Sequence, residues 1–302
     1  MHTNRLIYLF CFVLCLPPLF AAAAEDTFSK QVPIAADGKV FVKNLAGDIH
    51  IETWDKNEVL IKAEKSGHNQ NELDRVYIDV QSDPQVCTIK TRYESKGDVD
   101  VSVSFHLQVP KGVSIEANSI SGDFYLSRAT GPVQVEVISG TITINNLANR
   151  LLCRSVSGDI LVETLSGACT LKSVSGEIVL KDVTGPIAAH SVSSDIVIEN
   201  AGSAAELTVV TVSGDMIYRG KITPDGHISL KSHSGDIHME IPTNSAFELN
   251  ASTYSGRLSL ADAFTIKNVT SRKKTRLSGV VNGGGSLVRV NTFSGSLNIE
   301  AE

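Results

Sequence analysis

The stretch "SVSGDILVETLSGACTLKSVSGEIVL", Ser155 to Leu180, contains the phrase Val-Ser-Gly-acid-Ile twice, first from Val156 and again from Val174. Further copies follow at the same interval and then at slightly longer ones, with one much longer interval before the last copy. A fixed period of this kind is typical of stacked-repeat architectures. Aligned on the glycine, which we number position 0, the copies lie at Gly122, Gly140, Gly158, Gly176, Ser194, Gly214, Gly235, Gly256 and Gly295, with an early copy at Gly47.

Apolar residues recur at fixed positions in each copy. Positions +2 and +4 are apolar, as in Ile160 and Val162, and so are positions −7 and −5, as in Leu151 and Cys153. This alternation is typical of strands with one buried face. Position −2 is also apolar in most copies, and we expect the corner of the coil to turn it inward: Ile120, Ile138, Val156, Val174, Val192 and Val212.

Each repeat unit therefore has two strands and two corners, and two folds fit this pattern. In a β-solenoid each unit is one coil, and equivalent residues stack about 4.8 Å apart. In a meander each Ser-Gly would be a hairpin loop. The hairpin would place the apolar −2 residue on the same face as the acidic +1 residue, which disfavours it. We predict an all-β protein, a β-solenoid of the β-helix or β-roll kind with coils of ~18 residues, the period of the repeated phrase.

The chain divides into three regions. Residues 1–24 have a basic start at Arg5, an apolar core from Leu6 to Phe20 and small residues at the end, which predicts a secretory signal peptide. A retained membrane anchor is the alternative, disfavoured by a core shorter than about 20 residues. Residues 25–110 are expected to form a first coil and irregular strands, and residues 111–302 the solenoid. The basic, glycine-rich segment 271–285 is expected to be an exposed irregular coil.

Three ordered motifs carry a resemblance to a known family. They are "VKNLAGDIHIETWDKNEV" (42–59), "LQVPKGVSIEANSISGDFYL" (107–126) and "VRVNTFSGSLNIE" (288–300), with tandem "VSGDI" units before the last. Together they resemble the bacterial putative-adhesin, β-strand-repeat family, over nearly all of the chain after the signal peptide. The resemblance implies an exported, adhesin-head-like β-solenoid. It offers no catalytic residues to transfer.

An acidic residue follows the glycine in most copies and would form a row along one edge of the stack. Such a row could bind Ca²⁺ through carboxylate oxygens, or it could supply paired carboxylates for polysaccharide cleavage. The favoured interpretation is that each acid accepts hydrogen bonds from the backbone of its corner. The serine at −1 has the same corner role. The calcium candidates are Asp159, Glu177, Asp195 and Asp215.

Cysteine and histidine residues give no clear metal or disulfide motif. Cys153 and Cys169 occupy core positions of successive coils, too far apart diagonally for a bridge, and are expected to be buried free thiols. His233 is expected to point inward and stack on Tyr254, while His238 points outward. We therefore predict no metal site and no cofactor.

Two surfaces are candidates for binding. An outward apolar stripe at +3 could meet a partner or a second copy, unless a loop or the N-terminal region covers it: Leu161, Val179, Val197 and Ile217. A basic run could contact an anionic glycan or lipid headgroup, unless it is a solvated loop: Arg272, Lys273, Lys274 and Arg276. The net charge of −6 argues against a nucleic-acid partner.

The sequence has no recognisable catalytic centre. It favours a non-enzymatic, exported, adhesin-like binding or scaffold protein of the bacterial cell envelope, periplasmic or envelope-associated, whose partner is an unidentified glycan or protein. The competing hypothesis is a β-helix carbohydrate-active enzyme that uses part of the acidic row. Solenoid enzymes hold their catalytic groups in an irregular groove, whereas these acids are regular.

Overall fold

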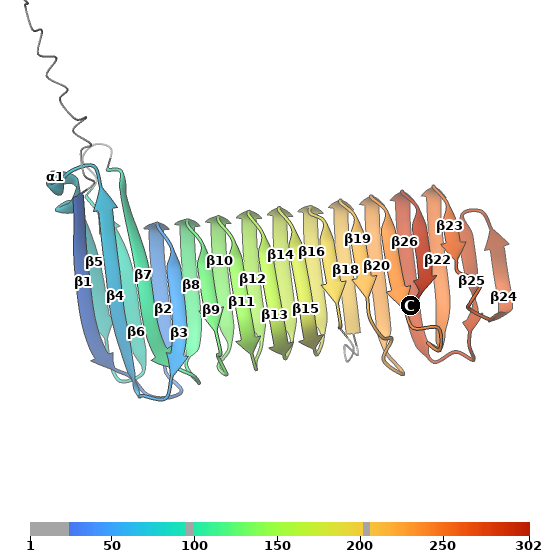
Figure 1. Cartoon of the computed structure of the whole chain (residues 1–302), viewed down its shortest axis with the longest axis horizontal. Helices are drawn as coiled ribbons and strands as arrows, with labels where there is room; N and C mark the ends of the chain where they lie inside the picture. Colours follow the sequence, from blue (N-terminus) through green and yellow to red (C-terminus); the bar gives the residue numbers. More distant parts are fainter. Residues whose placement is uncertain (1–23, 95–98, 202–205) are drawn as a thin grey trace, which may run out of the picture.

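Two long, open β-sheets face each other along the whole length of the molecule (Figure 1). The computed structural model describes residues 24–94, 99–201 and 206–302. Nearly all of the predicted signal peptide lies outside these residues. Sheet A has 13 strands and sheet B has 14, in the part of the chain that the structure describes. No helix in that part is long and apolar enough to cross a membrane.

The middle of the molecule is a regular solenoid in which the chain alternates between the two sheets. Equivalent strands of successive coils pair in parallel, so that Ile142 lies beside Ile160 and Ile160 beside Ile178. This pairing confirms the solenoid and excludes the meander. The coils are formed by β8 (Ser114–Ser121), β9 (Phe124–Ser127), β10 (Val133–Ser139), β11 (Ile142–Leu147), β12 (Leu151–Ser157), β13 (Ile160–Ser166), β14 (Cys169–Ser175), β15 (Ile178–Thr184), β16 (Ile187–Ser193), β17 (Ile196–Glu199), β18 (Glu206–Ser213), β19 (Met216–Arg219), β20 (His227–Ser234) and β21 (Ile237–Ile241).

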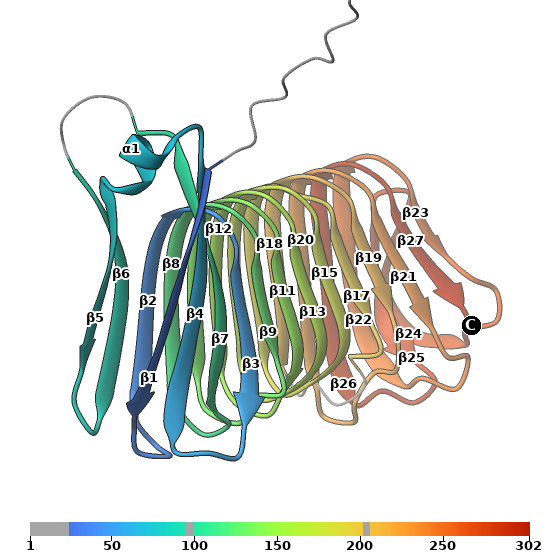
Figure 2. The same ribbon diagram turned by 60° about the vertical axis from the view of Figure 1, so that its left-hand side comes forward.

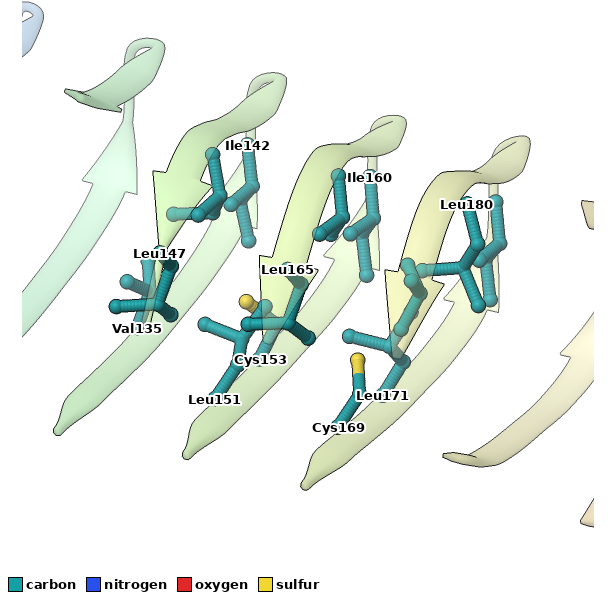
Figure 3. Close-up of a cluster of buried hydrophobic side chains, with 14 of the residues drawn as sticks. Val135, Ile142, Leu147, Leu151, Cys153, Ile160, Leu165, Cys169, Leu171 and Leu180 are labelled. Carbon is teal, nitrogen blue, oxygen red and sulfur yellow. The ribbon is translucent and has the colours of Figure 1, made fainter. Parts of the chain in front are cut away.

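The core is one continuous strip of aliphatic side chains between the sheets (Figure 3). It is built from the positions that the sequence predicted, −7 and −5 on sheet B and +2 and +4 on sheet A. Cys153 lies beside Leu171 and Cys169 beside Leu151, and both thiols are free and buried, as predicted. Burial raises the pKa of Cys169 to about 12 and that of Cys153 well above its ordinary value.

The prediction for position −2 is wrong: these residues point outward. The sheet B strands continue to position −1, so the alternation carries −2 to the same face as −4 and −6. The inward residue next to the corner is −3, which is buried and is Ser, Thr or Asn in every copy except Val137. Its side chain bonds to corner groups, as Ser173 Oγ does to the carbonyl oxygen of Ser175 at 3.1 Å.

The second corner of the regular coils is made by a residue with positive φ at position +6. Five successive coils place a non-glycine residue there, with φ between 52° and 60°. Asparagine and aspartate tolerate this conformation, whereas a β-branched residue is strained in it. The five residues are Arg128, Asn146, Thr164, Asp182 and Asn200.

The N-terminal region extends both sheets with antiparallel strands (Figure 2). In sheet A, β1 and β4 pair antiparallel and β4 pairs with β7, which lies parallel to β3. In sheet B, the β5–β6 hairpin lies beside β2. The sequence predicted a first coil followed by irregular strands in this region, but it gave no indication of β1 or α1. The elements are β1 (Ala24–Pro33), β2 (Lys39–Ala46), β3 (Ile49–Trp54), β4 (Glu58–Gly67), α1 (Gln70–Leu73), β5 (Val76–Ser82), β6 (Val86–Tyr93) and β7 (Val101–Pro110).

The C-terminal coils are not stacked in chain order, which explains the long interval between Gly256 and Gly295. The last unit, β26 and β27, lies between the coil of β20 and β21 and the coil of β22 and β23. The prediction of an irregular coil at 271–285 is wrong, because most of this segment belongs to a β-hairpin at the end of sheet B. These strands are β22 (Phe247–Ser255), β23 (Leu258–Leu260), β24 (Ile266–Lys273), β25 (Arg276–Val281), β26 (Ser286–Ser294) and β27 (Leu297–Ala301).

Candidate functional site

The most exposed apolar row of the molecule is the −2 position of sheet B, which we call the apolar ladder. Seven adjacent coils each contribute one aliphatic side chain that is between 40% and 51% exposed. The register pairs the residues on either side of each of them, so the side chains follow one line across the sheet. The aliphatic members are Leu45, Ile120, Ile138, Val156, Val174, Val192 and Val212.

The apolar ladder ends in stacked aromatic rings. His233 and Phe293 have ring centroids 4.9 Å apart, and Phe293 and Tyr254 4.8 Å apart, with the planes within 7° of parallel. The prediction that His233 points inward and stacks on Tyr254 is wrong on both counts. His233 is outward, and Phe293 lies between the two rings because β26 is inserted between β20 and β22.

Polar and charged side chains lie beside the first half of the apolar ladder. Arg154 and Glu136, both at position −4, form an ion pair with an N–O distance of 2.7 Å. Together with Lys43 and Asn118 they line a shallow hollow whose other wall is Ile120, Ile138 and Val156. A row of exposed aliphatic side chains bordered by charged ones is typical of a surface that binds a partner.

The predicted +3 stripe also lies outward, on sheet A. Leu161, Val179, Val197 and Ile217 occupy adjacent strands and point to the same face. All four are half-buried, and so they present less apolar surface than the apolar ladder does. Their role in binding stays a prediction.

The acidic row forms hydrogen bonds from coil to coil. Asp159 Oδ1 accepts the backbone N–H of Glu177 at 2.7 Å, and Asp195 Oδ1 accepts that of Asp215 at 2.8 Å. Asp48, Asp123, Asp215 and Asp236 repeat the same contact. One oxygen of each of these six aspartates is therefore used by a corner, in accordance with the structural interpretation. Calcium binding at Asp159, Glu177, Asp195 and Asp215 stays the disfavoured and untested alternative.

The corner at Ser194 differs from the others. Ser194 takes the place of the glycine without adopting a positive φ, and its side chain is buried, 2.6 Å from the hydroxyl of Ser191. A hollow opens beside it, lined by Glu177 and Asp195 among others. At this irregularity the acidic row borders a recess.

The basic run lies on the β24–β25 hairpin, with Lys273, Lys274 and Arg276 exposed at the end of sheet B. The backbone of Arg272 pairs with Leu277 in this hairpin. The run and the +3 stripe are on different sheets, so the structure does not bring them together. Contact of the run with an anionic partner stays a prediction.

Sequence reasoning missed a hollow of about 230 Å³ on sheet A, where β4 and β7 meet the first coils. The rings of His50 and His106 stack with centroids 5.1 Å apart, and Tyr125 lies 5.9 Å from His50. His50 and Tyr125 both occupy position +3 of their copies, so the sequence could have predicted that they lie side by side on neighbouring strands. His106 could not be placed beside them, because nothing in its sequence shows that β7 lies next to β3.

Comparison with known proteins agrees with this geometry. Residues 38–221 and 219–300 match the model of a family described as Toastrack DUF4097. The chain belongs to this family. Its two parallel-rich sheets are the β-solenoid-like Toastrack fold, and the predicted resemblance to an uncharacterised adhesin-type family is confirmed. A search of curated proteins found no match.

Solved structures similar to this Toastrack chain include three bacterial proteins. A "putative lipid binding protein" from Parabacteroides distasonis is 12% identical, with 91% of this chain and 96% of that chain covered and a TM-score of 0.40. A "putative adhesin" from Bacteroides fragilis is 13% identical, with coverage of 91% and 97% and a TM-score of 0.38. A "putative cell adhesion protein" from Clostridium sporogenes is 10% identical, with coverage of 92% and 100% and a TM-score of 0.28.

Proposed function

We propose that this Toastrack protein is an exported, non-enzymatic binding or scaffold protein of the bacterial cell envelope, and that the apolar ladder is its contact surface. The observation that carries the proposal is the row of seven aliphatic side chains, each about half exposed, that runs unbroken across adjacent coils. Surface apolar residues are ordinary when they are scattered. A contiguous row of them marks an interaction site.

The spacing of the apolar ladder suits an extended partner. Equivalent side chains of neighbouring strands are about 4.8 Å apart, so seven coils present a straight apolar line of about 30 Å. Covering it would release ordered water and contribute about 25 cal/mol for each Å² of apolar area buried. Arg154 and Glu136 at its border would fix the orientation of a partner more than its affinity.

The acidic row supports a structural role rather than catalysis. A carboxylate pair that acts as acid and base needs two different environments. Here the aspartates repeat one contact, with an Oδ1 atom bound to the next corner. The hollow at Ser194 is the exception that keeps polysaccharide cleavage as the competing hypothesis.

Site-specific photo-crosslinking in bacterial cells that produce the full chain tests the contact surface. A photoreactive residue at Val174, on the apolar ladder, is expected to give discrete adducts with envelope components. The same residue at Thr170, an outward position on the same strand, is the matched control and is expected to give few. Equal labelling at both positions, or none at Val174, would contradict the proposed surface.

A second experiment decides between binding and catalysis. The chain from Glu25 to Glu302 is incubated with envelope and extracellular polysaccharides, and the length of each glycan is followed with time. We expect no shortening. Shortening that is lost in the double variant Asp159→Asn, Asp195→Asn would establish the enzyme instead.

A further inference from the structure

Three potential metal ligands meet on the outer face of sheet A, far from the apolar ladder. His238 and Glu240 lie on β21, and Glu300 lies on the neighbouring strand β27, directly opposite Glu240. His238 Nε2 is 2.9 Å from Glu240 Oε1 and 3.8 Å from Glu300 Oε2. Among the described residues this is the only group of three such ligand atoms within 4.8 Å of one another.

The charges around this group leave a cation deficit. Like charges directly opposite each other on neighbouring strands are destabilising, and Glu240 and Glu300 are such a pair. The Arg219 guanidinium contacts Glu240 through Nε and Glu199 through Nη1, each at 2.9 Å, and Lys181 lies 3.8 Å from Glu199. Two permanent cations therefore face three carboxylates, those of Glu199, Glu240 and Glu300.

We propose that His238, Glu240 and Glu300 bind one divalent transition-metal ion of the zinc class. Zinc takes histidine nitrogen and carboxylate oxygen at about 2.0–2.2 Å in a tetrahedron, which places ligand atoms about 3.4 Å apart. The two distances from His238 Nε2, 2.9 and 3.8 Å, lie on either side of that value. An imidazole ligand selects zinc-class ions over calcium or magnesium.

The ligands are set on a rigid base. They come from paired strands, so their spacing follows from the register rather than from a loop. Asn298 Nδ2 donates to Glu300 Oε1 at 2.5 Å and so orients the carboxylate, and the hydroxyl of Ser259 in turn bonds to Asn298. Outer groups of this kind orient metal ligands. Three protein ligands leave one position open for water or for a donor atom of a partner.

Calorimetric titration of the chain from Glu25 to Glu302 with Zn²⁺ at pH 7.5 tests the site. We expect one saturable equivalent and a loss of affinity of tenfold or more in Glu300→Gln. The matched control is Glu163→Gln, which removes a carboxylate from the same +5 position of sheet A several coils away and is expected to bind as the parent does. The intensity of the ligand-field absorption of Co²⁺ in place of Zn²⁺ reports whether the ion is four-coordinate, and His238→Ala is expected to lower it toward that of the aqueous ion.

Two results would overturn the proposal. One is the absence of a saturable site, and the other is an affinity in Glu300→Gln equal to that of the parent. A variant His50→Ala that loses binding while Glu300→Gln keeps it would place the metal at the His50–His106 stack instead. All these side chains are on the surface, so circular dichroism is expected to show the same fold throughout.

Discussion

Each regular coil turns twice, and the two corners place different demands on the sequence. At the first corner the backbones of successive coils approach closely: a Cβ atom on Gly158 would lie 2.2 Å from the carbonyl oxygen of Gly140. At the second corner Thr164 also has a positive φ, of 57°, but its side chain is exposed to solvent. The first corner is limited by space at its glycine, whereas the second is limited by backbone conformation at +6 and by space only three residues later, where a Cβ on Gly167 would lie 2.6 Å from the carbonyl oxygen of Asn149.

This difference explains why one corner repeats its residue and the other does not. Glycine adopts the positive φ without steric cost, and it has no Cβ to make the close contact. The residue at the first corner is therefore almost always glycine, preceded by serine. Where Ser194 takes the place of the glycine, the backbone abandons the positive φ and a hollow opens beside it. Position +6 of the second corner accepts Arg, Asn, Thr and Asp and so has no sequence signature of its own, although glycine recurs three residues later at Gly131, Gly167 and Gly185.

The largest expected effect is that of Gly158→Ala. The positive φ costs about 1–2 kcal/mol for a residue with a Cβ, and the backbone contact adds a packing cost of about 1–3 kcal/mol. We expect the free energy of unfolding in urea to fall by about 2–5 kcal/mol. The control is Gly283→Ala, where φ is 102° but no atom lies within 4 Å of the new Cβ. If Gly158→Ala loses no more stability than Gly283→Ala, the close backbone contact does not contribute to the cost, and the positive φ alone explains it.

The next effect is expected at the acid beside that corner. Asp159→Ala removes the acceptor for the backbone N–H of Glu177, and we expect a loss of about 1 kcal/mol in urea unfolding. Asp159→Asn keeps an oxygen in the same place and is expected to lose less. Equal losses for the two variants would show that the charge, not the hydrogen bond, is what the corner needs.

The smallest effect is expected at the second corner, with the opposite sign. Thr164→Asn relieves a β-branched residue of a left-handed conformation and is expected to raise the free energy of unfolding by about 0.5–1 kcal/mol. Asn146 holds the same position one coil earlier and provides the precedent. Destabilisation of this variant would mean that the threonine side chain makes a contact that outweighs its strain.

Much of the fold follows from the sequence because the core is repetitive. The period and the alternation at −7, −5, +2 and +4 were enough to place the solenoid, the buried thiols of Cys153 and Cys169 and the outward His238. The inserted β26–β27 coil could not be predicted, because strand order depends on pairing between units that look alike. The hairpin at 266–281 was obscured by its charges and by the glycines that follow it at 283–285.

The candidate site was harder to predict, and for a specific reason. Valine at position −2 has the composition of a core residue, and sequence reasoning expected the corner to turn it inward. The deciding signal was at −3, where Ser173 and most of its equivalents are polar yet buried and form hydrogen bonds to corner groups. Composition therefore gave the wrong face, whereas unbroken alternation along the strand gives the right one.

Thiol accessibility tests the central claim, that the apolar ladder is a solvent-exposed surface. Val174→Cys and Ser173→Cys place thiols on adjacent residues that point to opposite faces, and the native Cys87, Cys153 and Cys169 are buried. We predict that a thiol reagent labels Val174→Cys in the folded protein at nearly the rate of a free thiol and labels Ser173→Cys only after unfolding. Protection of Val174→Cys together with rapid labelling of Ser173→Cys would contradict the account and remove its proposed contact surface.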